Sequence, residues 1–427
     1  MAQRARAGHR AAPVAPFRHG VQPTRHPVLR LLQIVGVAVA VLVVGTASVA
    51  GAAVWEVASS VTTGVKLTHV DGSVDAPPPD IGAVEGGVNL LLAGTDTRQG
   101  QGGQFQNRAD QAASSGAGNN DVTMLLHISE DHSSATVVSF PRDLMVPMPP
   151  CPRENGTTAG ASSKAMFNTA LSRGGLGCVV LTVEKLTGLT IPYAAEISFD
   201  GVMSMADAVG GVTVCLASPI KDPYVGLDLA AGEQTLSGAA ALAFVRSRHG
   251  VGDGSDLGRI SNQQVFLSSL TRKLTTDGVL ENPIRLYSIA KAAASSMTLS
   301  EYLSNPTTMV SIALALKDIG LQNIVFVQYP TSSDPANPNR VVPIASAAAA
   351  LNGALVADQP IQLSGKVGRA AVEQPAAPPA EAAPTPAPTA SAGSGASATP
   401  SQAPVVLPPS VTGQTAAQQT CSKGNVR

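Results

Sequence analysis

The sequence predicts an α/β fold: a mixed central β-sheet flanked by helices on both faces, an α/β/α sandwich. Two observations predict it. Short apolar runs rich in β-branched residues, typical of strands, alternate along the chain with segments whose apolar residues recur at helical spacing. Strands and helices interleaved in this way indicate a sheet covered on both faces. We expect one domain of this kind, spanning residues 86–365 of the 427-residue chain.

The strand-like runs come first in the pattern, and the helical segments lie mostly between the third and the last of them. The expected strands are 88–94, 122–129, 135–140, 211–216 and 323–329. The expected helices are 178–188, 199–210, 237–248 and 255–276.

Residues 31–55 carry no charge and are long enough to cross about 30 Å of hydrocarbon as a helix. Residues 1–30 contain six arginines and no acidic residue, so the positive-inside rule places them in the cytoplasm and the rest of the chain outside the cell. Residues 56–85 are then a spacer. A cleaved signal peptide is the competing interpretation, because Ala-Xaa-Ala-like steps occur at 49–53, but its apolar core would be unusually long.

The C-terminal residues 366–427 include a long Pro/Ala/Ser-rich tract, which predicts a disordered, extended tail. Four cysteines lie on the expected outer side, where disulfides persist. No CxxC or HExxH motif is present, so we expect one or two disulfides rather than a zinc site. Three pairings are possible, and the one we prefer is Cys178 with Cys215.

Charged residues gather where the first three predicted strands end or begin. Asp96 and Arg98 follow the first strand, Asp121 precedes the second, and Arg142 and Asp143 follow the third. If the strands run up, down and up, all of these emerge at one edge of the sheet, on strands about 4.8 Å apart. Two neighbouring carboxylates need a cation to remain ionised, and Mg²⁺ favours oxygen ligands. The pattern therefore predicts a magnesium site.

Each of these residues is also a common turn residue, so no single one carries the prediction. The Gly-, Gln- and Asn-rich loop 98–120 could also hold the two aspartates apart.

A second polar group comes from the predicted helix 255–276. At 100° per residue, Asp256, Arg259 and Gln263 fall on the same stripe as the apolar residues of its later turns, so they point inward. A buried arginine needs an anion. Asp256 could be that partner, or it could be the N-cap of the helix.

An anionic ligand is the other possible partner, because Arg246 and Arg248 reach the same loop from the preceding helix. The planar forks of these arginines suit phosphate oxygens. His249 would contribute to such an anion site or lie on the surface. Walker, GxSxG and GxGxxG motifs are absent. With a net charge of −1, the chain also has no basic field that would suggest a nucleic-acid binder.

Several motifs, taken in order over residues 86–350, resemble those of a known family. They are LLLAGTDTR, NNDVTMLLHI, VVSFPRDLMVPMP, FNTALSRGG, ADAVGGVTVC, GLDLAAGEQTLSGAAALAFVRSRH and SDLGRISNQQ. The chain resembles the LytR-CpsA-Psr phosphotransferases of Gram-positive cell envelopes, and its paired cysteines are similar to those of actinobacterial members.

This resemblance implies transfer of a glycan 1-phosphate from a polyprenyl-pyrophosphate carrier to a peptidoglycan hydroxyl, with Mg²⁺, by a domain outside the cytoplasmic membrane. It implies Asp96 and Asp121 as metal ligands. It implies Arg142, Arg246, Arg248, Arg259 and Gln263 as the pyrophosphate-binding set. Arg142, Asp143 and Asp256 are the implied catalytic residues, with Arg98 and Asn168 as further members of the candidate site. The isoprenoid chain needs an apolar groove, for which 179–189 and 201–209 are candidate walls.

Two other functions fit the same residues. One is a hydrolase that cleaves a lipid pyrophosphate with water as the acceptor. The other is a non-catalytic envelope regulator that binds polyprenyl phosphate; the expected extracellular placement counts against direct gene regulation.

Overall fold

The structure, a computed structural model, describes residues 32, 35, 37, 64–73, 87–98, 118–153, 155–276, 278, 289, 292–374 and 403–425. The chain divides into two units, residues 1–53 and residues 54–427, and nearly all described residues belong to the second. The predicted cytoplasmic segment 1–30 lies outside the described residues, as does most of the predicted transmembrane segment 31–55. In the part of the chain that is described, no helix has the length and apolar character needed to span a membrane.

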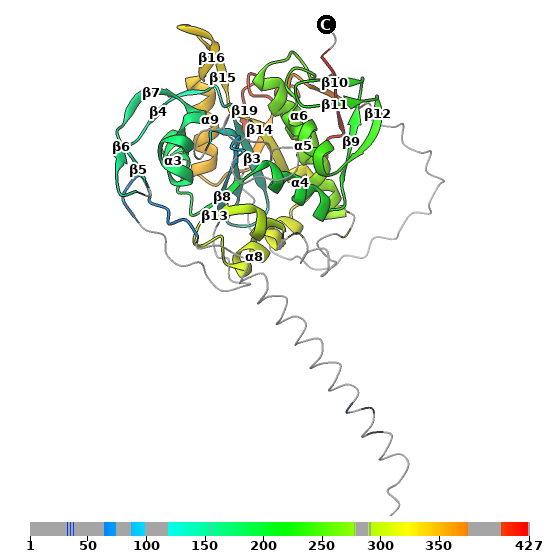
Figure 1. The fold of residues 1–427 in the computed structure, drawn as a ribbon, viewed down its shortest axis with the longest axis horizontal. Helices are drawn as coiled ribbons and strands as arrows, with labels where there is room; N and C mark the ends of the chain where they lie inside the picture. Colours follow the sequence, from blue (N-terminus) through cyan, green and yellow to red (C-terminus); the bar gives the residue numbers. More distant parts are fainter. Residues whose placement is uncertain are drawn as a thin grey trace, which may run out of the picture. The chain divides into compact units, whose positions relative to one another are not determined.

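A seven-stranded mixed sheet forms the centre of the second unit (Figure 1). Its strands, in spatial order, are β13 (Met297–Leu299), β8 (Tyr193–Ile197), β1 (Val88–Thr95), β2 (Asn120–Ile128), β3 (Ala135–Phe140), β14 (Ile324–Gln328) and β20 (Gly413–Thr415). β1, β2 and β3 pair antiparallel, whereas β8 joins β1 and β14 joins β3 in parallel. The predicted mixed sheet and the up-down-up order of its first three strands are confirmed.

Helices cover both faces of this sheet, as predicted. Figure 1 shows α3 (Ala170–Thr187) and α9 (Ala345–Val356) on one side of the strands and α5 (Gly238–Arg246) and α6 (Asp256–Thr276) on the other. Alternate residues of β1 serve the two sides, as the pleat of a strand requires. Leu91 packs into the core under α3, and Leu90 and Leu92 pack into the core on the opposite face, which also contains residues of α8 (Pro306–Lys317).

A smaller four-stranded sheet lies beyond α6. Its order is β12 (Gly232–Leu236), β9 (Val212–Leu216), β21 (Thr420–Ser422) and β18 (Ala371–Glu373). This sheet shares a core with α4 (Phe199–Ala208), α5 and α6. The predicted strand 211–216 is therefore confirmed, but it belongs to this second sheet.

Short ribbons and turns complete the fold. They are β4 (Met145–Met148) with β7 (Ser162–Met166), β5 (Cys151–Pro152) with β6 (Thr158–Ala159), β10 (Ile220–Asp222) with β11 (Leu227–Leu229), β15 (Thr331–Asp334) with β16 (Asn337–Pro343), β17 (Ile361–Leu363) with β19 (Val405–Leu407), and the 3-10 turns η2 (Phe167–Thr169) and η4 (Leu321–Asn323).

The prediction of a disordered tail over 366–427 was wrong at both ends of that range. β18 begins at Ala371, and residues 403–425 return to the domain, where β20 pairs with β14 and β21 inserts between β9 and β18. Leu407 and Val411 are fully buried. The Pro/Ala/Ser-rich composition belongs to residues 375–402, which lie outside the described residues. The residues on either side of this tract were wrongly included in the prediction, although they carry core side chains.

The predicted spacer, 56–85, also contains a segment that packs on the domain. Val65 bridges to Ser300, and Leu67 is buried. The buried His69 places its Nδ1 2.6 Å from Oε1 of Glu184 on α3. Residues 64–73 are thus part of the folded domain, and its boundary lies before residue 86.

Two disulfides form, Cys151–Cys178 and Cys215–Cys421, so the preferred pairing of Cys178 with Cys215 was wrong. The reason is topological. Cys178 lies on α3, on one face of the central sheet, whereas Cys215 lies in the second sheet and faces Cys421 on the neighbouring strand β21. Gly174 permits the first bond, because a Cβ there would lie 2.9 Å from the Cβ of Cys151.

Candidate active site at the sheet edge

The two predicted metal ligands meet where β1 ends and β2 begins. The backbone N–H groups of Asp96 and Asp121 both donate to the carbonyl oxygen of Asn119, at 3.1 and 3.0 Å, and Asp96 Oδ1 accepts from the Asn119 N–H at 2.7 Å. Gly118 makes this turn possible with φ +74°, and a Cβ at this position would lie 2.7 Å from Asp96 Oδ1. The intervening loop therefore does not hold the aspartates apart.

Arg142 follows β3 and is fixed to the same edge by three contacts. Its Nη1 lies 3.0 Å from Asp121 Oδ2, its N–H donates to Asp256 Oδ2 at 3.2 Å, and its carbonyl accepts from the Asn168 N–H at 3.2 Å. Burial acts to lower the pKa of Arg142, but Asp121, Asp256 and Asp143 outweigh it and raise that pKa. The guanidinium therefore keeps its charge. Asn168 acts here as an anchor for the Arg142 backbone.

The first turns of α6 point inward, as the helical phase predicts. Asp256, Arg259 and Gln263 have exposed fractions of 7%, 6% and 4%. Arg259 Nη2 lies 2.6 Å from Asp256 Oδ1 and donates to the Asp121 carbonyl, also at 2.6 Å. The ion-pair interpretation of Asp256 is thus confirmed. Gln263 lines the site, and its Nε2 donates to the Val245 carbonyl at 2.9 Å, which links α6 to α5.

Arg246, at the end of α5, has its guanidinium carbon 4.0 Å from the centre of the Phe199 ring. Burial lowers the pKa of Arg246, and the neighbouring charges of Arg98 and Arg259 lower it further, while Asp121 and Asp96 act to raise it. Arg98 and Arg246 therefore lie close enough to repel each other, as members of one positively charged group.

Asp143 lies beside this group. Its Oδ1 is 3.2 Å from Nη1 of Arg340 on β16. Burial raises the pKa of Asp143 and Asp256 raises it further, whereas Arg142, Arg340 and Arg248 lower it; the net direction is upward. Asp143 is thus a carboxylate with an enhanced affinity for protons, next to the arginines.

Three of these arginines retain hydrogen-bonding capacity. The Nε atoms of Arg142, Arg248 and Arg259 are buried, and among the described residues they have no hydrogen-bond partner. A buried donor without an acceptor destabilises a protein by about 1–3 kcal/mol, more for a charged group. All three arginines line one cavity, where an anion with several oxygens would offer their guanidinium groups acceptors.

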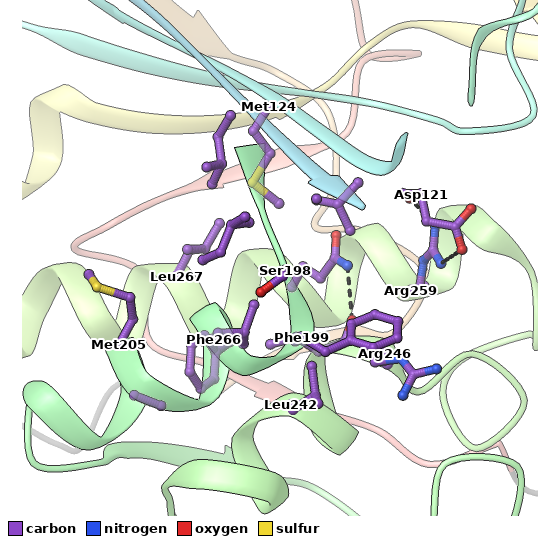
Figure 2. Close-up of a pocket in the computed structure, with 18 of the residues that line it drawn as sticks. Asp121, Met124, Ser198, Phe199, Met205, Leu242, Arg246, Arg259, Phe266 and Leu267 are labelled. Carbon is purple, nitrogen blue, oxygen red and sulfur yellow. Dashed lines mark hydrogen bonds and ion pairs between the residues drawn. The ribbon is translucent and has the colours of Figure 1, made fainter. Parts of the chain in front are cut away.

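These residues surround one end of a cavity of about 460 Å³ whose remaining walls are apolar. Figure 2 shows Asp121, Arg259 and Arg246 at one end and Met124, Met205 and Leu267 towards the other. We call the charged end the mouth, defined by Asp121, Arg142, Arg246, Arg248, Arg259 and Gln263. We call the apolar remainder the interior, represented by Met124, Val202, Met205, Phe266, Leu267 and Leu270.

The two predicted lipid walls have different outcomes. Residues of 201–209, on α4, line the interior, as predicted. Residues 179–189, on α3 and just after it, pack into the core on the opposite face of the central sheet, so that prediction was wrong. Sequence periodicity marks both as apolar helical surfaces and does not say which face of the sheet each one covers.

Three residues that matter for the site were not predicted. Asn119 joins the two aspartates, Arg340 pairs with Asp143, and the buried Asp222 accepts the Arg248 N–H at 3.1 Å. Asn119 precedes Asp121 by two residues and could have been noticed. Arg340 lies almost 200 positions from its partner in the chain, and no local pattern indicates it.

The described residues contain no group of three or more His, Cys, Asp or Glu side chains placed to hold a metal. Asp96 and Asp121, which are joined through Asn119, could therefore contribute at most two carboxylates. Such a pair fits Mg²⁺, which commonly takes one or two carboxylates and completes its coordination with waters and phosphate oxygens.

Comparison with known proteins gives consistent results. The LytR_cpsA_psr family model matches residues 52–352. The probable cell wall biosynthesis protein LcpB of Corynebacterium glutamicum is 38% identical over 228 residues, 53% of this chain and 52% of LcpB. The polyisoprenyl-teichoic acid–peptidoglycan teichoic acid transferase TagU of Bacillus cereus is 28% identical over 236 residues, 55% of this chain and 67% of TagU.

Among solved structures, B. subtilis TagV aligns with a TM-score of 0.48 and 20% identity, over 64% of this chain and 97% of TagV. The aligned part of the chain spans about half the length of LcpB. The family model covers well over half of the chain, in the region that holds the sheet, the mouth and the interior. The chain belongs to the LytR_cpsA_psr family.

Proposed function

We propose that this protein transfers a glycan 1-phosphate from a polyprenyl-pyrophosphate carrier to a hydroxyl of peptidoglycan. The observation that carries the proposal is the pairing of three buried, unsatisfied guanidinium Nε atoms with an apolar cavity that opens beside them. A pyrophosphate joined to an isoprenoid chain is the class of ligand that matches both halves. The names of TagU, a polyisoprenyl-teichoic acid–peptidoglycan transferase, and LcpB, a cell wall biosynthesis protein, support it.

The interior suits the lipid part of such a donor. The volume of the whole cavity, mouth and interior together, lies within the roughly 300–1,000 Å³ that is usual for small-molecule sites. Apolar surface buried there contributes about 25 cal/mol per Å² to the free energy of binding, so each isoprene unit that enters the interior strengthens binding of the lipid. The mouth holds the pyrophosphate by charge-assisted hydrogen bonds, which arginine forks form in pairs.

In the proposed reaction, a peptidoglycan hydroxyl attacks the phosphorus that carries the sugar. A new P–O bond forms, the bond to the bridging oxygen breaks, and the lipid monophosphate leaves with the electron pair. Arg142, Arg248 and Arg259 stabilise the charge that moves onto the phosphate oxygens. Asp143 accepts the hydroxyl proton. Its raised pKa supports this role, and its side chain is 21% exposed, against 6% for that of Asp256.

Magnesium is part of the proposal. Asp96 and Asp121 would hold it, and it would neutralise charge on the pyrophosphate. The domain is proposed to lie outside the cytoplasmic membrane, anchored by residues 31–55. The two disulfides support that placement, because such bonds persist in oxidising compartments.

The test is a reconstituted transfer reaction with a lipid-pyrophosphate glycan, peptidoglycan fragments and Mg²⁺. We expect glycan phosphate to become attached to the fragments and this product to be lost in Asp121→Ala. Release of sugar phosphate at the same rate without any acceptor would instead show a hydrolase. Binding of the lipid without turnover would show a non-catalytic binding protein.

A further inference from the structure

Two aromatic rings stand beside the mouth. Tyr224 lies in the turn between β10 and β11, and His249 follows Arg248; their ring centroids are 4.5 Å apart, with the planes inclined by 42°. Tyr224 is 79% exposed, more than any other large hydrophobic side chain among the described residues. Both rings line the same cavity as the arginines. Tyrosine is enriched in recognition surfaces, because its ring is apolar and its hydroxyl is polar.

A single buried carboxylate holds together the two backbone segments that carry these rings. Asp222 accepts the Tyr224 N–H at Oδ1, at 3.2 Å. Its Oδ2 accepts from Ser247 Oγ, the Arg248 N–H and the Gly250 N–H, at 2.8, 3.1 and 3.0 Å. Burial acts to raise the pKa of Asp222, but these hydrogen bonds outweigh it and lower that pKa, so the Asp222 carboxylate stays ionised.

The C-terminal segment supports the same loop from behind. Asn425 donates its N–H to the Gly250 carbonyl at 2.8 Å and its Nδ2 to the His249 carbonyl at 3.0 Å, while the Gly252 N–H donates to the Lys423 carbonyl at 3.1 Å. The Cys215–Cys421 disulfide attaches this segment to β9. The backbone that carries the two rings is therefore preorganised, which lowers the entropy lost when a ligand binds.

We propose that Tyr224 and His249 form the subsite for the first sugar of the donor, the pyranose bonded to the pyrophosphate. One face of a pyranose consists largely of C–H groups, which pack on an aromatic ring, and a tyrosine also offers a hydroxyl for hydrogen bonding. The location favours the donor sugar. Tyr224, His249 and Arg248 all line the cavity, and Tyr224 packs against the ring of the residue that follows Arg248, so a sugar on these rings would be on the side of the cavity where Arg248 binds phosphate.

This inference rests on the proposed function, and two lipid probes separate the two. One probe is polyprenyl pyrophosphate, and the other is the same lipid with a single N-acetylglucosamine on the pyrophosphate. We expect Tyr224→Ala to weaken binding of the sugar-bearing probe about three- to tenfold and to change binding of the bare lipid by less than about twofold. Tyr224→Phe keeps the ring and should retain most of the affinity.

Val406→Ala is the matched control. Val406 is another exposed hydrophobic residue, 59% exposed on β19, and it does not line the cavity; we expect it to bind both probes as the unaltered protein does. An equal loss for both probes in Tyr224→Ala, or no loss for either, would overturn the inference. So would a raised KM for peptidoglycan fragments with unchanged donor binding, because the rings would then serve the acceptor. Failure of the unaltered protein to bind either lipid would contradict the proposed function, and this inference with it.

Discussion

In the part of the chain that the structure describes, the mouth of the cavity is charged and lacks acceptors for some of its hydrogen-bond donors, whereas the interior is apolar and lacks a covering partner. The mouth holds arginines whose buried Nε atoms have no acceptor among the described residues, although Asp121 and Asp256 neutralise part of their charge. The interior is lined by Met124, Met205 and Leu267, which need no partner but expose apolar surface to water. The mouth is therefore suited to bind a specific anion with several oxygens, while the interior can accommodate any flexible apolar chain.

Binding specificity and binding affinity therefore originate at different ends of the cavity. Hydrogen bonds to charged groups depend on direction and distance, so the mouth recognises one chemical group. Burial of apolar area is non-directional, so the interior contributes affinity in proportion to chain length. Changes at the two ends should therefore alter different measurements.

The largest effect is expected at the mouth. Arg142→Ala should lower the rate of glycan transfer about 10²–10³-fold, because it removes a donor to the transferring group and the guanidinium that lies 3.0 Å from Asp121. Arg142→Lys should recover little, since an ammonium lacks the planar fork. The transfer reaction measures this. Lys164→Ala, which removes an ion pair with Asp334 away from the cavity, is the control, and a near-normal rate in Arg142→Ala would contradict the role.

The second effect concerns the support of the mouth. The Cys215–Cys421 bond joins residues 206 apart, and Cys151–Cys178 joins residues 27 apart. In the chain-entropy model, the longer loop contributes about 2 kcal/mol more to the free energy of unfolding. The double variant Cys215→Ser, Cys421→Ser should therefore unfold at lower urea than Cys151→Ser, Cys178→Ser. The reverse order would show that the C-terminal segment is weakly coupled to the domain.

A smaller effect is expected in the interior. Met205→Gln should weaken binding of a long-chain lipid pyrophosphate about tenfold, because a polar amide replaces apolar surface that the chain would cover. Binding of inorganic pyrophosphate should not change. Met203→Gln, on the same helix but outside the cavity lining, is the matched control. Equal losses for the lipid and for pyrophosphate would break the distinction between mouth and interior.

The smallest effect is a shift with pH. Burial and Asp256 raise the pKa of Asp143. Arg142, Arg340 and Arg248 lower it. Arg340→Gln removes one lowering influence, so the carboxyl becomes protonated at higher pH. If Asp143 must be ionised to accept a proton, the acidic limb of kcat/KM moves up, by less than about one pH unit because the pair is partly exposed.

Measuring kcat/KM against pH tests this role. Arg340→Lys should restore the profile, and Lys164→Gln should leave it unchanged. An acidic limb that stays in place or moves down in Arg340→Gln would show that Asp143 is not the proton acceptor.

Local sequence pattern was sufficient for β1, β2, β3 and β14 of the central sheet and for part of the mouth, whereas β8, β13 and β20 were not predicted. Short apolar runs rich in β-branched residues identified β1, β2 and β3. Their order brought Asp96, Asp121 and Arg142 to one edge, and helical phase turned Arg259 inward. These inferences succeeded because each depends on residues close together in the chain.

The failures concern contacts between distant residues. Cys421 pairs with Cys215 because β21 inserts beside β9, across a Pro/Ala/Ser tract that masked the folded residues after it. Arg340 and Asp222 reach the site through β16 and β10, and neither stands in a recognisable motif. Composition averages over a window, and it therefore misses a short strand at the edge of a disordered-looking segment.

One cavity is proposed to hold both the pyrophosphate and the lipid chain. A crystal structure with a bound polyprenyl pyrophosphate tests it most directly. We predict phosphate oxygens within hydrogen-bonding distance of the Nε atoms of Arg142, Arg248 and Arg259, and a chain that passes Met124 and Met205. A lipid bound elsewhere, such as in the small apolar pocket between Leu90 and Ile312, with the arginines unoccupied, would contradict the claim.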